Sequence, residues 1–64
     1  MNNTIKQLRA KHNITQEELA QLVQVTRQTI LAIEKDKYTP SLELAFKIAR
    51  IFKSNVEEVF QYEK

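Results

Sequence analysis

The chain has 64 residues, which is enough for a single domain with a small core and too little for two domains. It contains no cysteine, which excludes a disulfide framework, a cysteine-built zinc site and a thiol nucleophile, and its longest apolar run is too short to cross a bilayer. Ten lysines and arginines against eight acidic residues give a formal net charge of +2, a balance that fits an ordinary solvated surface as well as an acidic partner.

The first two helices are predicted from apolar spacing and capping signals. Ile5 and Leu8 begin a short helix near the amino terminus. A second helix is predicted over about residues 15–23, because Thr15 can cap it and Glu18 stands three residues later to complete a capping box. Its apolar stripe, expected to face the core, consists of Leu19, Leu22 and Val23.

A third helix is predicted over about residues 26–36, after a connection of only about three residues. Thr26 is its expected N-cap, and Val25 and Ile30 flank the cap as a hydrophobic staple. At about 100° per residue, the face toward the core carries Thr29, Ile30 and Ile33. The outward face then carries Gln28, Leu31, Ala32 and Lys35, with Arg27 at its edge.

Two further helices complete an all-α, five-helix domain without any strand signal. Pro40 and Ser41 begin the fourth helix, and Asn55 with Glu58 indicates a capping box at the start of the fifth. The side chains expected to form the core are Leu19, Leu22, Ile30, Ile33, Leu44, Ile48 and Phe52.

The outward face of the third helix has the side-chain types that read bases in a DNA major groove. Arg27 can bind guanine O6 and N7 with two hydrogen bonds, and Gln28 can bind adenine N6 and N7 in the same way. An apolar side chain can contact a thymine methyl group. Because exposed polar residues occur at the start of any helix, the hypothesis of DNA contact depends equally on the tight turn ahead of this one.

The segment ITQEELAQLVQVTRQTILAIEKDKYTPSLELAFKIA resembles the helix-turn-helix core of the Cro/phage-repressor-like (XRE) transcriptional regulators, which have a lambda-repressor-like fold. The residues with the spacing of that motif are Gln16, Ala20, Val25, Ile30 and Ile33. The resemblance implies one helix-turn-helix DNA-binding domain over residues 1–64. We expect a sequence-specific regulator, in particular a repressor that binds a (pseudo)palindromic operator through the major groove.

The resemblance also implies roles for individual residues. Base edges would be contacted by Arg27, Gln28, Leu31 and Ala32. Phosphates would be contacted by Gln16, Thr26, Thr29, Lys35, Lys37 and Tyr38. Arg9 and Glu34 match a structural ion pair between the first and third helices. Because one helix reads few base pairs, we expect a homodimer, with Phe60, Tyr62 and the exposed edge of the last two helices as the candidate interface.

The chain departs from the family's pattern in having no glycine. The positions where relatives often carry glycine hold Asn13, Gln24, Asp36 and Lys53. Asparagine and aspartate tolerate a positive φ comparatively well. At Gln24 and Lys53, by contrast, we expect either an altered turn or a strained backbone.

Other classes of function have weaker support. The glutamates at 17–18 and 57–58 stand in first helical turns, where they complement the helix dipole, so no catalytic carboxylate pair is expected. With His12 as the only histidine, we expect no metal site, and also no enzyme activity, cofactor or small-molecule ligand. The expected partner is double-stranded DNA rather than a membrane. We expect the protein to lie in the cytoplasm, associated with the nucleoid, in a bacterial or phage-type system. The alternative is a protein-interaction module of this fold, such as an antitoxin or an adaptor for an anti-repressor.

Overall fold

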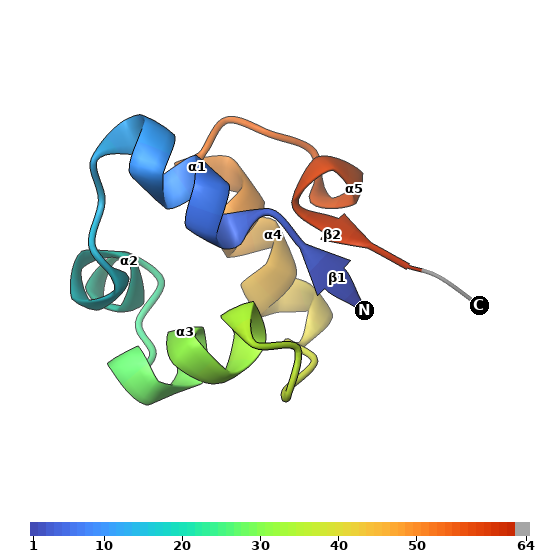
Figure 1. Ribbon diagram of the computed structural model, residues 1–64, viewed down its shortest axis with the longest axis horizontal. Coiled ribbons are helices and arrows are strands. Elements are labelled where there is room, and N and C mark those ends of the chain that lie inside the picture. The colour runs from blue at the N-terminus through green and yellow to red at the C-terminus, as the bar shows by residue number, and fades with distance from the viewer. Residues whose placement is uncertain (63–64) are drawn as a thin grey trace.

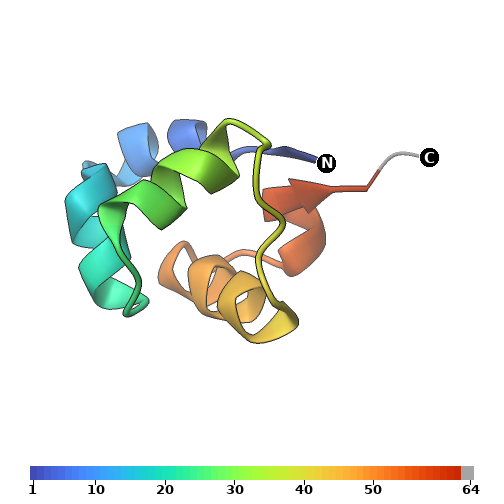
Figure 2. The same ribbon diagram turned by 90° about the horizontal axis from the view of Figure 1, so that it is seen from below.

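Five helices and two very short strands form the described part of the computed structural model, residues 1–62 (Figure 1). Figure 2, seen from the side of α3, places α1 above this helix and α4 below it. The helices are α1 (Ile5–His12), α2 (Gln16–Leu22), α3 (Arg27–Glu34), α4 (Leu42–Ile51) and α5 (Val56–Val59). The predicted all-α, five-helix fold is therefore confirmed.

The capping residues set the start of the helices. The Thr15 hydroxyl accepts a hydrogen bond from the Glu18 amide at 3.0 Å, and the Glu18 carboxylate accepts one from the Thr15 amide at 2.9 Å. Thr26 and Ser41 cap α3 and α4 in the first of these two ways. Each cap satisfies a backbone N–H that has no partner within its helix, which explains why these short helices begin where they do.

One apolar core lies between the helices. Its most deeply buried side chains are Ile5, Leu19, Val23, Ile30, Ile33, Ile48 and Val59. The expectation that Leu22 belongs to this core is wrong, because its side chain is 56% exposed. The buried side of α2 is centred on Leu19, Ala20 and Val23, and a residue at position 22 points about 100° away from that centre.

A two-stranded antiparallel ladder, which the sequence did not indicate, joins the two ends of the described chain. β1 (Asn2–Asn3) pairs with β2 (Phe60–Gln61), with Asn3 opposite Phe60. The Thr4 amide continues the contact by donating to the Val59 carbonyl at 2.9 Å. Strands of two residues leave no alternating pattern in a sequence, so only the folded chain reveals them.

Each of the first four helices ends in a left-handed residue that is not glycine. The φ angles are 57° at Asn13, 63° at Gln24, 59° at Asp36 and 54° at Lys53. In every case the next residue's amide donates back, at 2.9 Å, to a carbonyl of the last helical turn. These Schellman bonds run from Ile14 to Arg9, from Val25 to Ala20, from Lys37 to Ala32 and from Ser54 to Ala49.

The chain thus keeps the turn geometry of a glycine-containing fold and accepts the strain. A left-handed backbone costs a residue with a Cβ atom roughly 1–2 kcal/mol, and less for asparagine or aspartate. Of the two open explanations for Gln24 and Lys53, the strained backbone is the one observed. The Gln24 side chain accepts a hydrogen bond of 3.4 Å from the ammonium group of Lys47 on α4.

The strain at Lys53 leads to a stability prediction. Lys53→Gly should raise the free energy of unfolding by about 1 kcal/mol, because glycine adopts this backbone without the Cβ clash. Asn13→Gly is the matched control and should change stability by much less. Urea unfolding followed by circular dichroism measures both changes, and a Lys53→Gly protein less stable than the wild type would contradict the assignment of strain.

Candidate nucleic-acid interface

The turn between α2 and α3 fixes the angle at which α3 is presented. Ala20 is 2% exposed, and its small side chain lets the two helices approach closely. Its carbonyl accepts the Val25 amide at 2.9 Å, so the chain reverses within the turn before Thr26 caps α3. The first turn of α3 therefore projects away from the core, and the Arg27 and Gln28 side chains are exposed.

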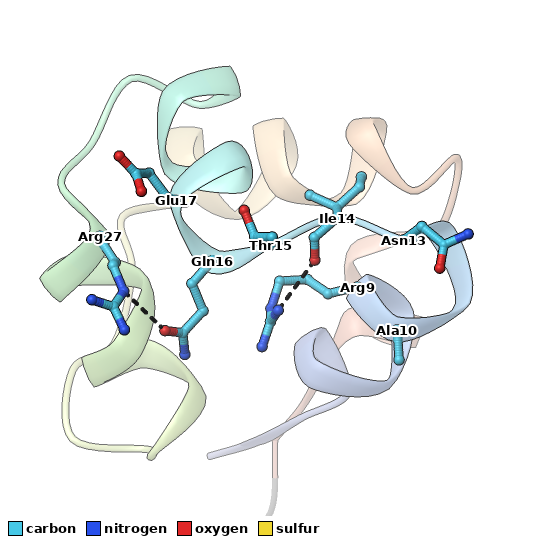
Figure 3. Close-up of a pocket in the computed structure, with 8 residues that line it drawn as sticks. All are labelled: Arg9, Ala10, Asn13, Ile14, Thr15, Gln16, Glu17 and Arg27. Carbon is cyan, nitrogen blue, oxygen red and sulfur yellow. Dashed lines mark hydrogen bonds between the residues drawn. The ribbon is translucent and has the colours of Figure 1, made fainter.

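A nearly buried ion pair joins α1 to α3. The Arg9 guanidinium donates from Nε to Glu34 Oε2 at 2.6 Å and from Nη2 to Oε1 at 3.2 Å. The exposed fraction is 15% for the Arg9 side chain and 7% for that of Glu34. Arg9 Nη1 also donates to the Ile14 carbonyl at 3.1 Å, which anchors the α1–α2 connection (Figure 3). Two-point contact and low exposure make this pair a rigid link between helices.

Gln16 connects this ion pair to the first turn of α3. Its Nε2 donates to Glu34 Oε1 at 3.0 Å, and this bond fixes which way the amide points. Its Oε1 then faces Arg27, whose Nε donates to it at 3.4 Å. Figure 3 shows the two side chains directed toward one another across the gap between α2 and α3. Gln16 thereby binds the Arg27 guanidinium through a single nitrogen, Nε.

The remaining predicted contact residues differ in how accessible they are. Lys35, Lys37 and Tyr38 are exposed and follow α3, with Lys35 as its C-cap and the other two in the loop beyond. Leu31 and Ala32 are only half-buried, so part of each side chain remains on the surface.

The two threonines among these residues form a local pair. The hydroxyls of Thr26 and Thr29 lie 3.0 Å apart, and the Thr26 hydroxyl also accepts the Thr29 amide. Thr29, placed on the core-facing side by helical spacing, is half-buried.

The candidate dimer residues lie in contrasting environments. Phe60 is 7% exposed and belongs to the core of its own chain, whereas Tyr62 is 79% exposed. Sequence reasoning missed two exposed apolar residues on α4, Leu42 at 71% and Phe46 at 50%. Their four-residue spacing, off the buried stripe of α4, was the available signal. Beside them lie two shallow grooves, and Val56 lines both.

Residues 1–62 contain neither a metal-binding cluster nor a membrane-spanning helix. This part of the chain has no group of three or more His, Asp or Glu side chains placed to hold a metal ion. None of its helices is long and apolar enough to cross a membrane.

Comparison with known proteins gives a consistent result. The profile of a family described as helix-turn-helix matches residues 5–59. A protein of Methanocaldococcus jannaschii, named as an HTH-type transcriptional regulator, is 59% identical over 63 residues, which cover 98% of this chain and 96% of the relative. Proteins with the same designation from Archaeoglobus fulgidus and Bacillus subtilis are 53% and 50% identical over 64 residues, covering all of this chain and 90% and 97% of the relatives.

The Arg9–Glu34 pair generates a second stability prediction. Glu34→Ala should lower the free energy of unfolding by about 3 kcal/mol, because it leaves a mostly buried guanidinium without its counter-charge. The double variant Arg9→Met/Glu34→Leu should be more stable than Glu34→Ala, since it removes the buried charge as well. Urea unfolding measures both, and a Glu34→Ala protein as stable as the wild type would show that the pair does not hold α1 to α3.

Proposed function

The chain belongs to the Cro/phage-repressor-like (XRE) family of helix-turn-helix transcriptional regulators, and from this premise we propose that it is a sequence-specific repressor that reads DNA by placing α3 in the major groove. Arg27 and Gln28 at the leading turn would contact base edges, and the exposed parts of Leu31 and Ala32 would contact thymine methyl groups in the next turn.

The observation that carries this proposal is the hydrogen-bond relay from Arg9 through Glu34 and Gln16 to Arg27. An exposed arginine on a short helix would normally sample many rotamers, and ordering it on binding costs affinity. Here one guanidinium nitrogen is occupied by the Gln16 carbonyl oxygen, and the two terminal nitrogens are left for a bidentate contact with guanine.

Phosphate contacts would supply most of the affinity and set the orientation on the duplex. Lys35, Lys37 and Tyr38 are exposed donors that follow the recognition helix. Thr26 and Thr29 offer their paired hydroxyls beside it. Gln16 uses one amide hydrogen on Glu34, so its second amide hydrogen remains for a phosphate oxygen.

A (pseudo)palindromic operator would require two copies of the chain. Two recognition helices about 34 Å apart would contact successive major grooves on one face of the duplex. We assign the interface to the exposed face of α4 around Leu42 and Phe46 together with Tyr62, because Phe60 is already buried in its own chain. In Figure 2 the recognition helix faces the viewer while α4 and α5 lie along the lower and right edges, so both surfaces can be occupied together.

The proposed activity needs no catalytic group, cofactor or small-molecule ligand. Bound at an operator that overlaps a promoter, the protein would act by excluding the transcription machinery. We place it in the cytoplasm, associated with the nucleoid; an origin in a bacterial or phage-type system stays a prediction.

The base-reading assignment is tested with an operator obtained from a random-oligonucleotide selection. Arg27→Ala should lower the preference for one base pair by roughly 1–3 kcal/mol, whereas Lys35→Ala should weaken binding to all sequences alike and reduce the salt slope by about 1. Fluorescence anisotropy on operator and scrambled duplexes, over a series of salt concentrations, measures both effects.

This experiment also separates the proposal from the alternative of a protein-interaction module. A module that acts only on another protein would show weak binding with the same affinity for operator and scrambled duplex. Unchanged base preference in Arg27→Ala, with the operator still bound tightly, would instead refute the role given to Arg27.

The dimer interface is tested in the absence of DNA. Phe46→Glu should convert a dimer into a monomer in analytical ultracentrifugation, because it would place a charge in an apolar contact. Leu22→Glu is the matched control, since Leu22 is 56% exposed on α2 and should leave the dimer intact. A wild-type protein that is monomeric at high micromolar concentration would contradict the assignment.

A further inference from the structure

The side chain of Asn3 bridges two helices at the carboxyl end of the recognition helix. Its Nδ2 donates to the Ile33 carbonyl in the last turn of α3 at 2.9 Å. Its Oδ1 accepts the Ile5 amide at the start of α1 at 3.2 Å. Thr4, the residue at the N-cap position of α1, makes no side-chain capping bond of its own. Asn3 therefore caps α1 and binds the end of α3 with a single amide group.

The backbone of Asn3 is itself fixed to the core. In the β1–β2 ladder it pairs with Phe60, which is 7% exposed. One residue later, the Thr4 amide donates to the carbonyl of Val59, whose side chain is fully buried. The Asn3 side chain thus extends from a fixed point, and its bond to Ile33 acts on α3 rather than on the strand.

The point of contact matters because α3 has only eight residues. Its leading end is held by the turn from α2 and by Gln16 on Arg27, as described above. At its other end the ion pair holds the Glu34 side chain, while Asn3 holds the backbone itself, at a carbonyl that also accepts the Asp36 amide at 3.0 Å. The tilt of the second turn, which carries Leu31 and Ala32, depends on where this end is placed.

We propose that Asn3 is a positioning residue for DNA recognition: its bond to the Ile33 carbonyl sets the depth at which the second turn of α3 meets the base edges. This inference rests on the proposed function, in which α3 occupies the major groove. Asn3 makes no contact with the bases in this role, and the first-turn contacts of Arg27 depend on it little. Its loss should therefore change base preference selectively rather than weaken binding evenly.

The neighbouring residue provides a matched control. Thr4 lies in the same segment, and its hydroxyl donates to the Glu58 carbonyl in α5 at 2.9 Å, a bond as long as that of Asn3 but directed away from α3. Asn3→Ala removes the bond to α3 together with the bond that Asn3 accepts from Ile5 at the start of α1. Thr4→Val removes the bond to α5 while keeping the shape of the side chain. Both proteins are compared with the wild type at a temperature where circular dichroism shows all three fully folded.

The first measurement is base preference from a random-oligonucleotide selection. The positions read by the second turn are identified as those whose preference changes in Leu31→Ala. At these positions Asn3→Ala should lower the preference about three- to tenfold, which is the factor expected when the net free energy of roughly one hydrogen bond is lost. The preference set by Arg27 should change less than about twofold, and the Thr4→Val profile should match that of the wild type.

The second measurement is amide hydrogen exchange in the free protein, which does not depend on DNA binding. The Asp36 and Lys37 amides, which close the last turn of α3, should exchange about fivefold faster in Asn3→Ala and at the wild-type rate in Thr4→Val. If Asn3→Ala keeps the wild-type base profile, or differs from Thr4→Val in neither measurement, the proposal is wrong. A wild-type protein without base preference would refute the proposed function and this role together, while unchanged exchange beside a clear wild-type preference would refute only the role of Asn3.

Discussion

The carboxylate of Glu34 is the group on which the arrangement of the proposed DNA-binding surface depends. It lies almost buried on the recognition helix, and three hydrogen bonds from Arg9 and Gln16 compensate for its removal from water. The same bonds fix α1 against α3 and orient the amide that holds Arg27. Across residues 1–62, no buried side-chain nitrogen or oxygen is left without a partner. A nearly buried charge can thus link two helices because neighbouring side chains provide its hydrogen bonds.

A second constraint comes from the helix ends. All four left-handed positions are occupied by residues with a Cβ atom, and the backbone keeps its Schellman geometry at each of them. The bonds that close these turns, and the apolar side chains that follow at Ile14 and Val25, outweigh the local cost. A chain of 64 residues with a small core has a free energy of unfolding of about 5–15 kcal/mol, so several strained positions lower it by a substantial fraction. The turn between α2 and α3 is therefore specified by packing rather than by the preference of Gln24.

The recognition helix is held from three directions by different kinds of contact. The turn and Gln16 hold its first residues, the ion pair holds its side chain at Glu34, and Asn3 holds the Ile33 carbonyl in its last turn. The third contact depends on β1, which in turn is paired with the segment that follows α5. Leu42 lines a groove together with Val56 of α5 and Phe60 of β2. The two-stranded ladder therefore links the surface assigned to pairing with the end of α3 that Asn3 holds.

The sequence by itself determined the five helices, the caps at Thr15 and Thr26, the start of the fourth helix at Pro40 and Ser41, and the helix-turn-helix family. Capping and apolar periodicity are local and leave a direct pattern. It also located the four glycine-replacing positions, but at Gln24 and Lys53 both an altered turn and a strained backbone fitted the sequence. Only the tertiary structure decided that Leu22 is exposed, that Phe60 is buried in its own chain, and that Asn3 reaches the end of α3. These features arise where segments distant in sequence meet. Apolar periodicity and capping residues along the sequence do not indicate which neighbouring segment will cover a side chain.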